Sequence, residues 1–144
     1  RQTADVDFLI AIDSCDKVLP FLKEEGYQVV NQSEIFVRLA DNEYPLIDID
    51  LLLVKPDTLA EIIKEGTEVK ISGRRFIIPS LSHLIALKLH SIKQDAAHRE
   101  YKDLLDIIEL IKANHLDATA DDFKSLCVTY ASEVVYQKII GLLS

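Results

Sequence analysis

Apolar and polar side chains alternate along residues 4–12, and this period of two predicts a β-strand. Valine, phenylalanine and isoleucine side chains occupy one face of the predicted strand, and the other face begins with Asp5 and Asp7. Because alternate residues of a strand point to the same side, the two carboxylates share a face. An otherwise apolar strand therefore carries two acidic side chains close together.

A second apolar run, residues 46–54, carries a matching pair, Asp48 and Asp50. These aspartates lie among aliphatic residues, where an unpaired buried charge is costly. If the two strands are neighbours with these faces matched, three or four carboxylates converge on one small patch. Carboxylates held so close repel one another, so a positive group is expected among them. A hard divalent cation such as Mg²⁺ is the usual occupant of a site built from such oxygens.

The remaining pattern predicts an α+β fold in two parts. A small α/β lobe with a mixed sheet covers residues 1–79, and a helical lobe covers residues 80–144, because the periodicity becomes helical after Pro79-Ser80. In the first lobe we expect strands at 4–12, 27–31, 35–40 and 46–54, helices before Gly26 and over 57–65, and a hairpin that turns at Ser72-Gly73-Arg74. In the second we expect helices over 80–94, 98–114, 119–130 and 131–143.

Several residues are typical of helix ends. Asp13-Ser14 and Ser80 are expected to cap the N-termini of the helices that follow them. Gly26 is expected at the C-terminal end of the first helix, and Thr119 with Asp122 resembles a capping box.

The charge and composition narrow the classes of function. The chain of 144 residues has a formal net charge of −8, which disfavours an extended interface with DNA or RNA but leaves a local basic patch open. No apolar run approaches about 18 residues, so we expect no membrane span. Cys15 and Cys127 have no metal-binding spacing, and we interpret them as reduced thiols of a cytoplasmic protein, with Cys127 in the core.

Lys88 is an unusual residue within the predicted helix 80–94. It lies in the middle of the apolar stripe, four residues after Leu84 and three after Ile85. Its aliphatic stem can pack there while its ammonium group reaches a cleft or a carboxylate. It is either a lysine at the edge of the core or a partner for a phosphate or carboxylate group.

The next predicted helix carries a group of charges. Lys102, Asp103 and Asp106 lie opposite the stripe that its apolar residues suggest. That stripe consists of Tyr101, Leu104, Leu105, Ile108 and Ile111. The residues alone favour a solvated face with weak ion pairs.

Other catalytic motifs are missing from the sequence. The four histidines have no zinc-type spacing, and no serine lies in a nucleophile elbow. With four glycines in the whole chain, no Walker or dinucleotide-binding loop is formed.

Four segments resemble motifs of nucleotidyltransferases with the DNA polymerase β-like fold. Residues 1–10 are similar to their R-x-T-x-D-hydrophobic-D segment, and residues 48–52 to the strand of their third carboxylate. Residues 79–89 resemble the segment that opens the helical lobe in the AbiEii-like toxin branch, and residues 99–107 resemble that branch's R-x-x-K-D-x-x-D-I signature. The segments occur in the right order.

This resemblance implies a metal-dependent enzyme that transfers a nucleoside monophosphate from an NTP to an acceptor and releases pyrophosphate. Mg²⁺ or Mn²⁺ would be the cofactor. Asp5 and Asp7 would hold the metal ions, and Asp50 would be the third carboxylate, which activates the acceptor hydroxyl. Asp48 shares that face and is the other candidate for this role, and Thr3 is a candidate nucleotide-binding residue.

The resemblance also implies roles for the helical lobe and for partners. Lys88 would contact the triphosphate or brace the acidic strand, and Lys102 and Asp103 would line the cleft or fix the lobes. ATP is the expected nucleotide. In the toxin branch the acceptor is typically RNA, often tRNA, or another macromolecule such as a protein, and the partner is a cognate antitoxin.

One feature of the family lies outside this sequence. In the superfamily a Gly-Gly or Gly-Ser turn just upstream of D-x-D cradles the triphosphate with backbone N–H groups. The chain begins at Arg1 without that turn and contains no methionine. We interpret it as a fragment, a processed chain or one with an N-terminal part before Arg1.

Three functional interpretations follow from the sequence. The first is the nucleotidyltransferase. The second is a non-catalytic domain of the same fold, which binds or regulates without a phosphate cradle. The third is a structural domain whose acidic strands are salt-bridged to Arg38, Lys88 or Arg99.

Overall fold

The computed structural model describes residues 5–40 and 47–144, apart from the side chain of His98. The chain divides into two compact units, Arg1–Glu65 and Gly66–Ser144. Both helices and strands occur in each unit, so the predicted α+β class is confirmed. The predicted turn over residues 41–45 and the candidate Thr3 lie outside the described residues.

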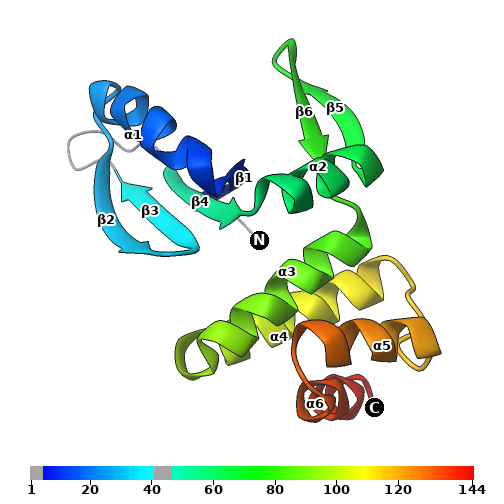
Figure 1. The fold of residues 1–144 in the computed structure, drawn as a ribbon. Helices are drawn as coiled ribbons and strands as arrows, with labels where there is room; N and C mark the ends of the chain where they lie inside the picture. Colours follow the sequence, from blue (N-terminus) through cyan, green and yellow to red (C-terminus); the bar gives the residue numbers. More distant parts are fainter. Residues whose placement is uncertain (1–4, 41–46) are drawn as a thin grey trace. The chain divides into compact units, whose positions relative to one another are not determined.

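The first unit is built around a four-stranded mixed sheet (Figure 1). Its elements are β1 (Asp5–Ala11), η1 (Ile12–Ser14), α1 (Cys15–Glu24), β2 (Gln28–Ser33), β3 (Phe36–Ala40), β4 (Asp48–Val54) and α2 (Pro56–Glu65). The strand order is β1-β4-β3-β2, in which β1 runs parallel to β4 and the other neighbours are antiparallel. The two strands that carry the aspartate pairs are thus direct neighbours, as the sequence analysis required for a carboxylate patch.

Helix α1 covers one face of this sheet (Figure 1). The core beneath it joins Val37 and Leu39 of β3 to Leu51 and Leu53 of β4, and all four are buried. Val18, Leu19 and Leu22 of the helix pack against this core. Because strand side chains alternate, the residues between these core positions point to the opposite face.

Gly26 ends α1 as the sequence predicts. Its φ of 100° lies in the left-handed region, and its N–H donates to the carbonyl of Lys23 at 3.1 Å. The N–H of Tyr27 donates to the carbonyl of Leu22 at 3.0 Å, which completes a Schellman motif. At the other end, Ser14 occupies the N-cap position of α1, as predicted. Its side chain makes no capping hydrogen bond there.

The second unit opens with a β-hairpin and continues as four helices. Its elements are β5 (Thr67–Ile71), β6 (Arg74–Ile78), α3 (Leu81–Gln94), α4 (Ala96–Ala113), α5 (Asp121–Tyr130) and α6 (Glu133–Leu143). Ser72 and Gly73 form the turn with φ values of 50° and 78°, the type I′ pattern that suits a two-residue hairpin. The predicted hairpin is confirmed, and it groups with the helical unit, whereas the sequence analysis placed it in the first lobe.

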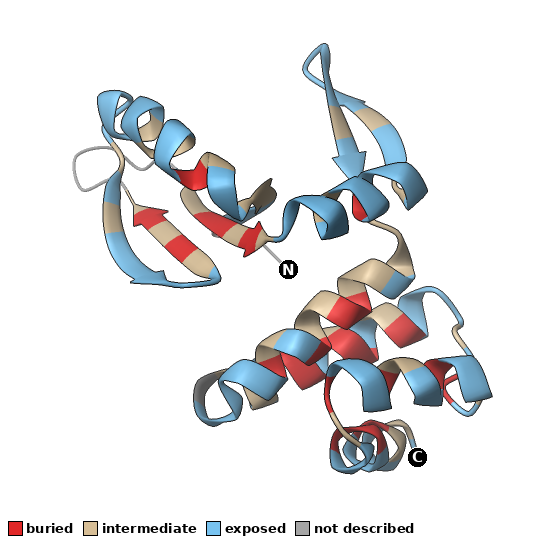
Figure 2. Ribbon diagram, in the orientation of Figure 1, coloured by how far each residue is buried: buried red, intermediate tan, exposed pale blue. Residues whose placement is uncertain are grey.

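The four helices enclose one core (Figure 2). Leu89, Ile107, Cys127 and Ile139, one from each of α3 to α6, are fully buried in it. The predicted core position of Cys127 is confirmed, and both cysteines are free thiols. Within the described part of the chain, none of the helices has the length and apolar character needed to cross a membrane.

The two serine and threonine caps expected in the helical unit have different outcomes. Ser80 caps α3 as predicted, because its hydroxyl accepts a bond from the N–H of His83 at 3.4 Å. The predicted capping box at Thr119 is wrong, since α5 begins at Asp121 with no side-chain cap. The hydroxyl of Thr119 instead donates to the Asp117 carboxylate at 2.6 Å, and its backbone N–H donates to the same oxygen at 2.9 Å.

Burial of the Cys127 thiol predicts an alkaline decline in stability. Burial raises the pKa of this thiol from the ordinary 9.0 to about 11, because the thiolate would be desolvated. The folded chain therefore holds the thiol proton more tightly than the unfolded chain. The stability that this proton contributes is complete below about pH 9 and is lost as pH rises through about 11. The free energy of unfolding, measured with urea, should fall more over this pH interval for the wild type than for Cys127→Ala. Equal pH slopes for the two proteins would contradict this.

Candidate functional site

The register of the sheet brings the two aspartate pairs together. In the parallel pairing of β1 with β4, Asp5 lies opposite Asp48 and Asp7 lies opposite Asp50. Since Ile49, Leu51 and Leu53 belong to the core beneath α1, all four aspartates lie on the face of the sheet away from that helix. The strand pairing therefore places both aspartate pairs on one face of the sheet, which is the condition that the sequence analysis set for a carboxylate patch.

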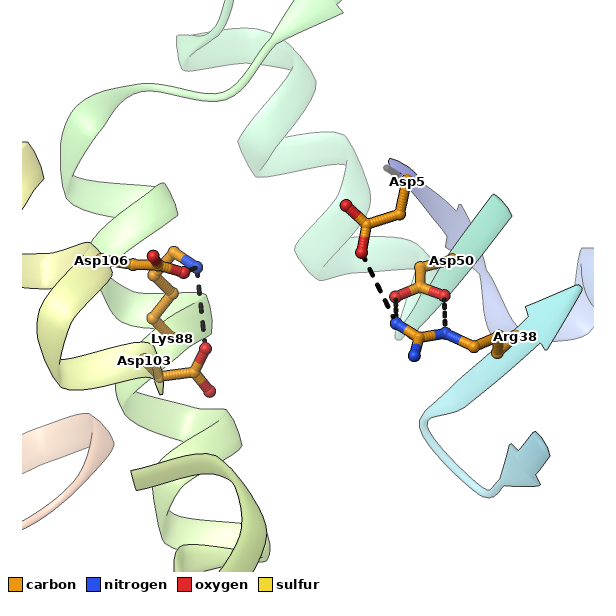
Figure 3. A network of polar contacts seen from close by, with 6 residues as sticks. All are labelled: Asp5, Arg38, Asp50, Lys88, Asp103 and Asp106. Carbon is orange, nitrogen blue, oxygen red and sulfur yellow. Dashed lines mark hydrogen bonds and ion pairs between the residues drawn. The ribbon is translucent and has the colours of Figure 1, made fainter. Parts of the chain in front are cut away.

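Arg38 supplies the positive group at this patch (Figure 3). It lies on β3 directly opposite Asp50 of β4 in the antiparallel pairing. Its Nε donates to Oδ1 of Asp50 at 2.7 Å, and its Nη2 donates to Oδ2 at 2.5 Å. The same Nη2 lies 3.7 Å from Oδ2 of Asp5. One guanidinium thus bridges carboxylates from two neighbouring strands.

Burial makes this contact necessary for Asp50. The residue is only 3% exposed, so its charge requires a partner with good hydrogen-bond geometry. The pKa of Arg38 is raised above its ordinary value, first by the hydrogen bonds to Asp50 and also by the charges of Asp50, Asp5 and Asp48, although burial opposes this.

The donor set suits a hard cation only in part. Carboxylate oxygens are the ligands that Mg²⁺ and Mn²⁺ prefer, and Asp5, Asp7 and Asp48 are all at least partly exposed. Asp50 differs, because both of its oxygens accept bonds from Arg38. Within residues 5–40 and 47–144, no three histidine, cysteine, aspartate or glutamate side chains are arranged to hold a metal ion. Binding at Asp50 would require Arg38 to move.

The helical unit contains a second arrangement of one cation between two aspartates (Figure 3). Lys88 of α3 donates to Oδ2 of Asp106 on α4 at 2.7 Å, and its Nζ lies 3.7 Å from Oδ1 of Asp103. Asp103 is 4% exposed. The carboxylate partner that the sequence analysis considered for Lys88 is thus present within this unit.

The predicted apolar face of α4 needs correction. Tyr101 is 81% exposed and Leu105 is 40% exposed, whereas Asp103 is buried. The buried ridge is formed by Leu104, Ile107, Ile108 and Ile111, and Asp103 lies one turn before Ile107 on the same side. The solvated-face interpretation is therefore wrong for Asp103 but right for Lys102, which is exposed.

One atom of this second arrangement lacks a hydrogen bond. Oδ2 of Asp103 is buried and has no hydrogen-bond partner among the described residues. A buried carboxylate with an unsatisfied oxygen is sensitive to the loss of a nearby cation such as Lys88. A lysine in the middle of an apolar stripe was the signal in the sequence that an acidic group faces it. The identity of that group could not be read from the sequence.

Comparison with known proteins adds no family to this picture. No model of a known protein family matches the chain, and no curated protein matches it.

Removal of the Arg38 charge is expected to destabilise the first unit. Arg38→Gln leaves the Asp50 carboxylate buried without a counter-charge, so the free energy of unfolding should fall by about 2 kcal/mol. Asp50→Asn should cost a similar amount, because an amide cannot accept both guanidinium bonds. Both are measured by urea denaturation. The control is Arg75→Gln, whose side chain is 74% exposed and which should cost less than about 1 kcal/mol. An Arg38→Gln variant as stable as the wild type would show that Asp50 does not depend on this pair.

Removal of the Lys88 charge is expected to destabilise the helical unit. Lys88→Met keeps the aliphatic volume but removes the ammonium group that contacts Asp103 and Asp106, so the free energy of unfolding should fall by about 2–3 kcal/mol. Lys93→Met on the same helix is the control, because Lys93 is exposed and its replacement should change stability by less than about 0.5 kcal/mol.

A double-mutant cycle between Lys88→Met and Asp106→Asn isolates the pair. A coupling energy above about 1 kcal/mol is expected for side chains in direct contact. A coupling near zero would mean that the two charges stabilise the unit independently.

Proposed function

We propose that this protein is a metal-dependent nucleotidyltransferase, which transfers a nucleoside monophosphate from an NTP to an acceptor. The observation that carries the proposal is the in-register parallel pairing of two D-x-D strands, which sets Asp5 opposite Asp48 and Asp7 opposite Asp50 on the face away from α1. Two-metal phosphoryl transfer needs carboxylates that bridge cations about 4 Å apart. The matched strands bring four aspartates to one face of the sheet, and metal binding there would require side chains such as Arg38 to rearrange.

In this proposal the first strand holds the cofactor. Asp5 and Asp7 would hold Mg²⁺ or Mn²⁺, which supplies charge stabilisation for the transferred phosphoryl group. The acceptor hydroxyl oxygen would form a bond to the α-phosphorus while the bond to pyrophosphate breaks. Asp50 or Asp48 would accept the hydroxyl proton, since both lie on the same face of the neighbouring strand.

Residues of the helical lobe have secondary roles in the proposal. Lys88 joins α3 to α4 through Asp106 and Asp103, so we assign to it the positioning of these helices. Lys102 is exposed on α4 and is the candidate there for a contact with the triphosphate. The motif resemblance alone suggests the other components. ATP is the proposed nucleotide, RNA or a protein is the proposed acceptor, and an antitoxin is the proposed partner.

A second candidate function follows from a different observation. Asp50, the candidate third carboxylate, is bonded through both oxygens to Arg38. A domain that used its acidic face only for binding or for structure could keep this pair permanently. The alternative is therefore a non-catalytic domain with the same sheet.

Calorimetric titration with Mn²⁺ and ATP tests the proposal. The wild type should bind Mn²⁺–ATP, and Asp5→Asn combined with Asp7→Asn should weaken binding by at least about tenfold, because two ligand charges are lost. Asp16→Asn with Asp57→Asn is the matched control, since it removes the same charge from exposed positions on α1 and α2.

Two results would count against the enzyme. Absence of Mn²⁺–ATP binding by the wild type would leave the non-catalytic function. Equal weakening by the control pair would show that net charge alone, and not the D-x-D strand, governs binding.

A further inference from the structure

We infer that the β5–β6 hairpin binds single-stranded RNA through the cations near its turn, Lys70, Arg74 and Arg75, and through the ring of Phe76. This inference rests on the proposed function and deepens it, because it names RNA as the acceptor and assigns the surface that holds it. It depends on the charge, the exposure and the strand register of the hairpin, and not on the aspartates of the first unit.

The hairpin is basic within an acidic chain. Residues 67–78 contain three cations and one anion, Glu68, so their formal charge is +2, whereas the whole chain carries −8. No residue of this segment is buried, and Figure 2 shows most of it as exposed. Among the described residues, Lys70 and Arg74 have no ion-pair partner, and Nη1 of Arg75 lies 3.9 Å from Oε2 of Glu68. An anionic ligand would therefore meet cations that the fold leaves largely uncompensated.

The strand register places two of these cations directly opposite each other. Lys70 of β5 pairs with Arg75 of β6. Like charges in directly opposed positions of an antiparallel pair destabilise it. A two-stranded hairpin has little stability to lose, so this cost is large for the element that carries it. Phosphate groups bound between the two side chains would remove the repulsion, and an arginine matches phosphate oxygens with paired hydrogen bonds.

The other face of the hairpin combines a cation with an aromatic ring. Arg74 and Phe76 are two residues apart on β6 and therefore share a face. Phe76 is half-buried, and Ile71, which lies opposite Arg74, is 55% exposed. Unpaired bases stack on aromatic rings, while basic side chains contact the adjoining phosphates. This combination favours single-stranded RNA over an acidic peptide, whose carboxylates need only the cations.

The acidic charge of the chain limits the contact to this hairpin. Exposed charges farther away than about 8 Å are largely screened at physiological salt, so they weaken binding at the turn without preventing it. Binding through phosphates depends on salt, because counterions are released from the nucleic acid. Three cations that each neutralise one phosphate predict a slope of about −2 for the logarithm of the binding constant against the logarithm of the salt concentration.

Fluorescence anisotropy with an unstructured RNA of about 12 nucleotides tests the inference, in EDTA and without NTP. Arg74→Gln combined with Arg75→Gln should weaken binding at least about tenfold and make the salt slope shallower by about 1, because two phosphate contacts are lost. Lys93→Gln with Lys112→Gln is the matched control, since it removes the same charge from exposed positions on α3 and α4 of the same unit. The control pair should change the affinity by less than about twofold.

Phe76→Leu tests the contact with the bases. The variant keeps every charge, so its affinity should fall at least about threefold while the salt slope stays the same. Thermal unfolding establishes that this variant is folded, and the test with the exposed arginines does not depend on it. Polyglutamate serves as a competitor. If it displaces the RNA as well as unlabelled RNA does, the occupant is an acidic protein and the inference is overturned.

The outcomes separate this inference from the proposed function. Absence of RNA binding by the wild type, equal weakening by the control pair, or tighter binding of DNA with the same sequence would overturn the inference. Binding of Mn²⁺–ATP without binding of RNA would leave a nucleotidyltransferase with another acceptor. Binding of RNA without binding of Mn²⁺–ATP would keep the hairpin as an RNA-binding surface and refute the enzyme.

Discussion

The in-register parallel pairing of β1 with β4 is the constraint on which the acidic site depends. Side chains alternate along both strands, so a slip of one residue would turn Asp48 and Asp50 toward α1 and its apolar core. Burial of Leu51 and Leu53 beneath that helix prevents the slip, because the core would lose both side chains. The hydrophobic face of the sheet therefore fixes the positions of the carboxylates on the other face.

Crowded carboxylates require compensation, and the chain uses the same solution in both units. Arg38 lies between Asp50 and Asp5, and Lys88 lies between Asp106 and Asp103. In each case one aspartate is almost completely buried and makes the arrangement sensitive to loss of the cation. The two cations differ in chemistry. The planar guanidinium bonds both oxygens of one carboxylate, whereas the ammonium acts as a point charge with one close partner.

The sequence predicted the strands better than the helix faces, for a geometric reason. A strand has only two faces, so the alternation of residues assigns each side chain without ambiguity, and Ser72-Gly73 marks a tight turn directly. A helix turns about 100° per residue, so neighbouring choices of apolar stripe differ little in the sequence. Helix α4 buries Asp103, whose carboxylate lies 3.7 Å from the ammonium group of Lys88 on α3, and exposes Tyr101. That contact comes from another helix, which periodicity within α4 cannot reveal.

Stability alone does not account for the Arg38–Asp50 pair. Replacement of a buried ion pair by well-packed apolar side chains is often neutral or stabilising, because the charges no longer have to be desolvated. A sheet that needed only to fold would be served as well by two aliphatic residues at these opposed positions. The buried carboxylate of Asp50 is costly to desolvate, and the two hydrogen bonds from Arg38 offset part of that cost. The paired charges also help to fix the register of β3 against β4, because a slip would separate Arg38 from Asp50 and leave a buried carboxylate without its partner.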